Sequence, residues 1–75
     1  MTYAETKENY WKAYGLQQRK LGQIRAVEYL QKMLKETKDG DVTFRLNKTL
    51  ITYERELGVC NIELAKAKHE LHAIA

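Results

Sequence analysis

Proline is absent from this sequence, and cysteine occurs only once among its 75 residues. Without proline no residue is present that forces a break in a helix interior, and one cysteine excludes an internal disulfide. No run approaches the roughly 20 consecutive apolar residues of a membrane-spanning helix, and no apolar stretch follows a basic start as in a signal peptide. We therefore expect a helical protein with no membrane segment, located in the cytoplasm, where a lone thiol stays reduced.

What is present is a short, mixed composition, with 44% hydrophobic and 31% charged residues. This leaves room for one domain, residues 1–75. A domain of this size buries too little surface to be comfortably stable alone, and without disulfides the usual remedies are a metal or another chain. The net charge of +3 is mildly basic and does not by itself indicate nucleic-acid binding.

Turn-forming residues cluster at residues 38–41. Gly40 can close a preceding helix in the left-handed conformation, and Asp41 can cap a following one. At the amino end, Thr2 and Glu5 have the spacing of a capping box. We predict a helix over about 3–38, a turn at 39–41 and a helix over about 42–74. So short a turn makes the helices antiparallel, with residues whose numbers add to about 80 side by side.

A heptad pattern of apolar residues predicts a seam along the second helix. Its members are Leu46, Leu50, Tyr53, Leu57, Cys60, Leu64, Ala67, Leu71 and Ile74. The first helix offers a less regular partner. Its members are Tyr10, Ala13, Leu16, Ile24, Val27, Leu30 and Leu34, with Tyr14 and Leu21 at the edge. The predicted fold is all-α, an antiparallel, coiled-coil-like two-helix hairpin.

A second row of small and apolar residues repeats at helical spacing on each helix. The same register pairs Tyr29 with Ile51 and Gly22 with Gly58, so the two rows are expected to share one face. A two-helix hairpin has only one inside, and we expect this face to meet another helix, in a four-helix bundle dimer or on a larger partner. The predicted interface comprises Trp11, Gly15, Gln18, Gly22, Tyr29, Met33, Ile51, Gly58, Ile62 and Ala65.

The glycines in these rows also favour a contact with another helix. Gly15, Gly22 and Gly58 each cost about 1 kcal/mol relative to alanine in a helix interior. Small residues in a row allow the backbone of another helix to approach closely. The alternative is that Gly15 ends a short first helix and begins a kink.

Residues able to do chemistry are sparse. His69 and His72 have a spacing that can bind zinc, but the His-Glu-x-x-His pattern and further ligands are lacking. Cys60 occupies a seam position, where a free cysteine behaves as a small hydrophobe. No phosphate-binding loop or nucleophile–base set occurs. We expect no enzymatic activity, no metal and no cofactor.

Near the amino end, three aromatic residues are interleaved with lysines. Tyr10 and Tyr14 are expected to fill the open end of the hairpin against Ala67 and Leu71, and Trp11 to point outward toward an interface.

Cations are also grouped on the first helix. Lys7, Arg25 and Lys32 share one side and are the candidate nucleic-acid contacts. The i to i+4 spacings of Glu8 with Lys12 and Glu28 with Lys32 instead favour an ordinary solvated surface.

The leading functional prediction is a non-enzymatic protein–protein interaction module, a small regulatory adaptor or inhibitor of the phage or mobile-element kind. It would self-associate or dock on a larger protein. One alternative is an RNA-binding dimer, because the outline resembles the dimeric plasmid RNA-binding hairpins of the ROP type in architecture, without matching residues. The other is a structural or scaffold subunit of a larger assembly.

Overall fold

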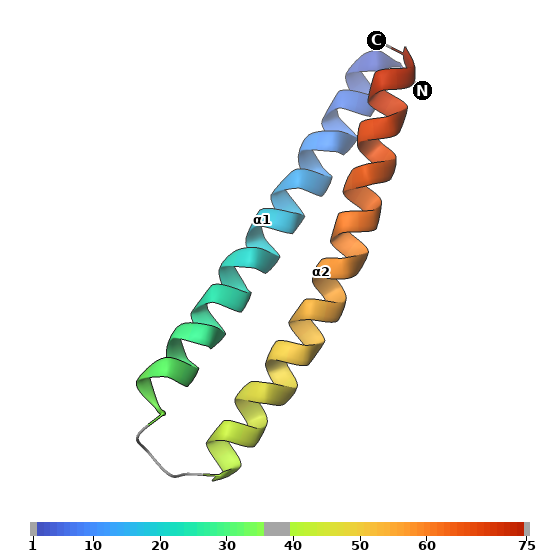
Figure 1. Cartoon of the computed structure of the whole chain (residues 1–75). Coiled ribbons are helices and arrows are strands. Elements are labelled where there is room, and N and C mark those ends of the chain that lie inside the picture. Colours follow the sequence, from blue (N-terminus) through green and yellow to red (C-terminus); the bar gives the residue numbers. More distant parts are fainter. Residues whose placement is uncertain (1, 36–39, 75) are drawn as a thin grey trace.

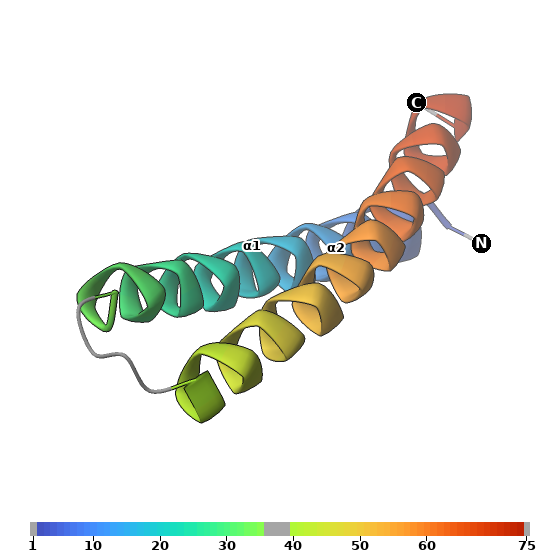
Figure 2. The same ribbon diagram turned by 60° about the horizontal axis from the view of Figure 1, so that its bottom comes forward.

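Two long helices form the whole of the described structure, a computed structural model that places residues 2–35 and 40–74. Helix α1 spans Tyr3–Met33 and helix α2 spans Gly40–Ile74. They pack antiparallel, so that the two ends of the chain lie together (Figure 1). Figure 2 shows that the helices cross at an angle within a single layer. The predicted all-α hairpin is confirmed, with principal extents of 54 × 16 × 13 Å.

The start of α1 is capped as the sequence predicts. Thr2 is extended, and its hydroxyl oxygen accepts a hydrogen bond of 3.2 Å from the backbone N–H of Glu5. The Thr6 hydroxyl donates to the carbonyl oxygen of Thr2 at 3.0 Å, and Thr6 is only 2% exposed. Thr6 thus fills the seam at the open end of the hairpin, a position that the apolar pattern did not identify.

Loss of this cap is expected to weaken α1. Replacing a threonine N-cap by alanine removes the acceptor for a free helix amide, and we expect Thr2→Ala to lower the free energy of unfolding by about 1 kcal/mol. Denaturant titration followed by circular dichroism measures this. Thr2→Ser retains the acceptor and is expected to behave like the unchanged protein; an equal loss in both variants would contradict the capping role.

The boundary between the helices differs from the prediction. Helix α1 ends at Met33, not near residue 38, and the Leu34 N–H donates to the Leu30 carbonyl at 2.9 Å. The next heptad position in the sequence after Leu34 is Lys38, which offers no apolar side chain to bury, and helices in proteins draw most of their stability from such burial. Of the predicted turn at residues 39–41, residue 39 lies outside the described residues.

Gly40 does not close α1. It is the first residue of α2, and none of the described glycines has a positive φ. Asp41 lies within the first turn of α2 and not before it. A carboxylate in that position still interacts favourably with the positive end of the helix dipole.

The predicted seam of α2 is confirmed along most of its length. The residues from Leu46 to Leu71 that the heptad pattern selects are buried or half-buried, whereas Ile74, the last predicted member, is 48% exposed. On α1 the pattern is confirmed for Tyr10, Ala13, Ile24, Val27 and Leu34. It is wrong for Leu16 and Leu30, which are 50% and 45% exposed.

Polar residues occupy the seam positions of α1 where the apolar pattern fails. The Gln17 side-chain amide donates to Asn61 Oδ1, and that of Gln31 to Asn47 Oδ1, both at 2.7 Å. The Lys20 ammonium is paired with Glu56 and lies 4.5 Å from the centre of the Tyr53 ring.

These polar contacts also fix the register of the hairpin. The expected register would place Arg19 opposite Asn61, but the structure places Gln17 there, two residues away. Apolar seams tolerate a range of registers, whereas paired polar groups specify one. The register expected from the short turn therefore differs by about two residues from the one observed.

Candidate interaction surface

Many large apolar side chains lie on the outside of the hairpin. Within the described residues the buried hydrophobic ones are Ala13, Ile24, Val27 and Ala67, whereas twelve large hydrophobic residues are 40% exposed or more. The chain exposes 6071 Å². A compact monomer of 8.8 kDa should expose about 4,800 Å². The hairpin therefore has about 1,300 Å² of excess surface, which exceeds the roughly 800 Å² that one partner contributes to a standard interface.

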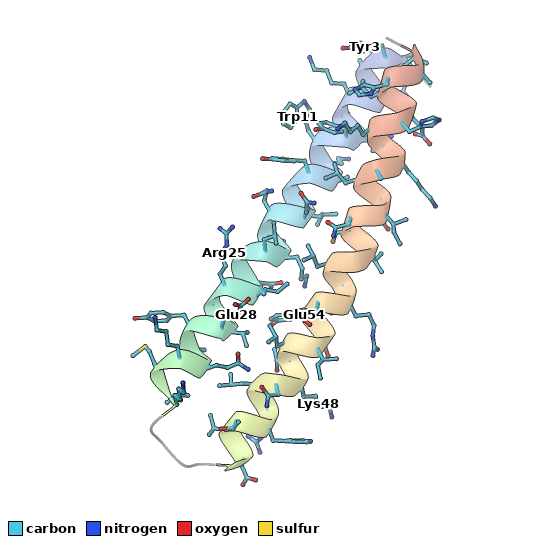
Figure 3. All side chains as sticks on the ribbon, in the orientation of Figure 1. Tyr3, Trp11, Arg25, Glu28, Lys48 and Glu54 are labelled. Atoms are coloured by element: carbon cyan, nitrogen blue, oxygen red, sulfur yellow. The ribbon has the colours of Figure 1, made fainter. Side chains whose placement is uncertain are left out.

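One set of these residues forms a row along the outer side of α1. Gly15 lies two residues after Ala13, and Tyr29 lies two residues after Val27; Ala13 and Val27 are buried in the seam. Two residues turn an α-helix by about 200°, so the row points away from α2, and Figure 3 shows Trp11 on that margin of α1. We call this set the outward row of α1; all its members are exposed, and they are Trp11, Gly15, Gln18, Gly22, Ala26, Tyr29 and Met33.

Helix α1 runs through this row without interruption. Gly15 lies within the continuous span Tyr3–Met33, so the alternative of a kink at Gly15 is not what the structure shows. A Cβ atom added at Gly15, Gly22 or Gly58 would meet nothing within 4 Å. These glycines are therefore not required by packing inside the hairpin.

The corresponding row of α2 lies on the outer side of that helix. Ile51 and Ile62 are each 59% exposed, and Gly58 and Ala65 are exposed as well. The rows of α1 and α2 thus point outward from different helices and do not form the single continuous face expected from the sequence. Other exposed apolar residues fell outside the predicted interface, notably Phe44 at 68% and Val59 at 52%.

The aromatic cluster at the open end is partly as predicted. Tyr10 is half-buried at the seam, near the end where Ala67 is buried. Tyr14 was expected to pack inside with Tyr10 but is 40% exposed. Trp11 was expected to point outward and is 56% exposed. The Trp11 ring makes edge-to-face contacts with both tyrosines, with centroids 5.3 Å from Tyr10 and 5.7 Å from Tyr14. These contacts hold the indole in place while leaving much of it accessible.

The candidate nucleic-acid contacts Lys7, Arg25 and Lys32 are all exposed and form no ion pair with another described residue. Arg25 lies on the same margin of α1 as Trp11 (Figure 3), and Glu28 and Glu54 are exposed. The predicted Glu8–Lys12 pair forms at 3.8 Å. A Glu28–Lys32 pair does not appear among the described contacts.

The remaining candidate groups stay apart. His69 and His72 are exposed on α2, and Cys60 is half-buried in the seam. Over residues 2–35 and 40–74, no group of three or more potential metal-ligating side chains comes together.

Compared with family models, curated proteins and solved structures, the chain matches none of them. Neither described helix combines the length and the apolar character needed to cross a membrane. The composition and shape of the surface are therefore the observations from which a function can be inferred.

Proposed function

We propose that the chain is a non-enzymatic interaction module, a small adaptor or inhibitor that acts by packing its exposed helical surfaces against another protein chain. The observation that carries this proposal is that twelve large hydrophobic residues are 40% exposed or more within the described part of the chain, while four hydrophobic residues are buried and most of the seam is only half-buried. Isolated exposed hydrophobic residues are normal on any protein, but rows of them along a helix are typical of interaction sites.

The physical reason is the small core of a single helical layer. Each helix of this hairpin can bury only the stripe that faces its neighbour, and in α1 that stripe contains Gln17, Lys20 and Gln31 in place of apolar residues. A further helix against the outer side would remove additional apolar surface from water, at about 25 cal/mol per Å². The proposal therefore predicts that a covering partner stabilises the fold.

Light scattering combined with size-exclusion chromatography tests this proposal. We expect a species at least twice the chain mass of 8.8 kDa, and Trp11→Ala is expected to shift it toward the monomer by removing a large exposed aromatic anchor. Tyr3→Ala is a matched control, because Tyr3 is 51% exposed but lies outside the predicted interface. A stably folded monomer that is unaffected by Trp11→Ala would refute self-association, and open-ended growth would indicate a scaffold subunit.

A second candidate function, nucleic-acid binding, is favoured by Lys7, Arg25 and Lys32, exposed cations without ion pairs to described residues. If it operates, RNA binding measured by fluorescence anisotropy should weaken steeply with salt, because phosphate contacts release counterions. Arg25→Glu should then weaken binding at least tenfold, and Lys48→Glu, on the outer side of α2 (Figure 3), should change it little. Absence of binding to structured RNA and duplex DNA at low salt would remove this candidate.

A further inference from the structure

The outward row of α1 is centred on Gly22. Its members lie at residues 11, 15, 18, 22, 26, 29 and 33, and these positions are symmetric about Gly22. When two copies of such a helix pack antiparallel around a twofold axis, each residue faces the one at the mirrored position of the other copy. Gly22 then faces Gly22 of the partner subunit, and every other residue of the row faces a residue of the partner's row, out to both ends.

The side chains at mirrored positions complement each other in size. Gly15, which has open space around it, would face Tyr29 of the partner subunit, whose counterpart in this chain is 62% exposed. Gln18 would face Ala26 of the partner subunit. At the two ends Trp11 would face Met33 of the partner subunit, a favourable contact between an aromatic ring and a thioether. In each pair of facing residues, a large side chain meets a small or flexible one. Gly22 at the centre of the row allows the two backbones to approach closely.

We infer that the partner covering α1 is a second copy of this chain, paired antiparallel through the outward row with its twofold axis at Gly22. This rests on the proposed interaction function and names its partner and geometry. The row extends over about 33 Å at 1.5 Å per residue. The excess surface of about 1,300 Å² per chain is larger than the roughly 800 Å² per partner that a standard interface buries.

The corresponding side of α2 fits this geometry less well. The position mirrored across Gly58 from Ile62 is Glu54, and burying an unpaired charge at a twofold contact is unfavourable. On α1 the seven positions of the outward row are uncharged, and the cations Arg19 and Arg25 lie at the edge of the row, three residues to either side of its central glycine. The pairing therefore leaves α2 on the outside of the assembly.

Disulfide trapping tests the pairing, because a disulfide requires the Cβ atoms to approach to about 4 Å. In a Cys60→Ala background, Gly22→Cys is expected to form a dimeric species in a glutathione buffer, since residue 22 meets itself at the axis. Gly15→Cys alone is expected to form no covalent dimer, but to form one when mixed with Tyr29→Cys. Gly58→Cys, an open glycine of α2, is the control and is expected to link at least tenfold less than Gly22→Cys. Circular dichroism shows that each variant is folded.

The outcomes separate the pairing from the proposed function. Self-linking of Gly15→Cys would overturn the antiparallel arrangement, and linking of Gly58→Cys in place of Gly22→Cys would assign the contact to α2. If light scattering shows a dimer but Gly22→Cys does not link, the pairing is wrong while the interaction function stands. A stably folded monomer that forms none of the links would contradict both.

Discussion

Ile24→Ala is expected to remove a large part of the free energy of unfolding of the protein. Ile24 is 7% exposed and is one of only four buried hydrophobic residues in the described structure. Truncating a buried isoleucine to alanine removes about 2–5 kcal/mol. At the usual 0.05–0.15 kcal/mol per residue, a 75-residue chain has only about 4–11 kcal/mol in total.

Circular dichroism with denaturant titration measures this effect, and a pair of valines provides the matched control. Val27 is 7% exposed and Val59 is 52% exposed, so the same truncation to alanine removes a core contact in one case and surface in the other. We expect Val27→Ala to be clearly destabilising and Val59→Ala to change stability by less than about 0.5 kcal/mol. Equal losses at both positions would mean that the seam between α1 and α2 is not the core.

The second large effect is expected at Gly22, where substitutions should change folding and association in opposite directions. A Cβ at Gly22 meets nothing in the hairpin, and alanine is about 1 kcal/mol better than glycine in a helix interior. Gly22→Ala should therefore increase helicity. Gly22→Leu also fits the isolated hairpin, yet it places a bulky side chain at the centre of the proposed contact. We expect it to weaken association at least tenfold.

Sedimentation equilibrium gives the association constant, and Gly58→Leu is the control. Gly58 is equally open but lies on α2, so leucine there should leave association unchanged. If Gly22→Leu associates as strongly as the unchanged protein, no helix backbone approaches α1 at that point. If the Gly22→Leu monomer were less helical than the monomer of the unchanged protein, the unobstructed space around Gly22 would be contradicted.

Periodicity predicted the hairpin because an unbroken heptad pattern in α2 requires a partner helix, and the short connection leaves only an antiparallel one. It misplaced part of the seam of α1 because it counted only apolar residues. Gln17 and Gln31 are inside through amide–amide hydrogen bonds to α2, while Leu16 and Leu30, one residue away from them, are outside. Such pairing depends on which polar groups meet across the seam, and neither helix reveals that alone.

For the candidate surface too, helical spacing predicted some features and missed others. Helical spacing was enough to predict that Trp11, Gly22 and Tyr29 are outside, since each helix has one stripe facing its partner. It was not enough to show that the rows of α1 and α2 point outward from different helices. That depends on the rotation of each helix about its axis, which the polar seam contacts determine. The outward row can pair around Gly22 only because α1 is continuous through Gly15.

This hairpin is expected to need another chain against its exposed apolar surface in order to be stably folded. Circular dichroism at 222 nm over a wide dilution series, with sedimentation on the same samples, measures this dependence. We expect helicity and melting temperature to fall on dilution as dimer converts to monomer. A monomer of 8.8 kDa that keeps full helicity and melts cooperatively at a temperature independent of concentration would contradict it.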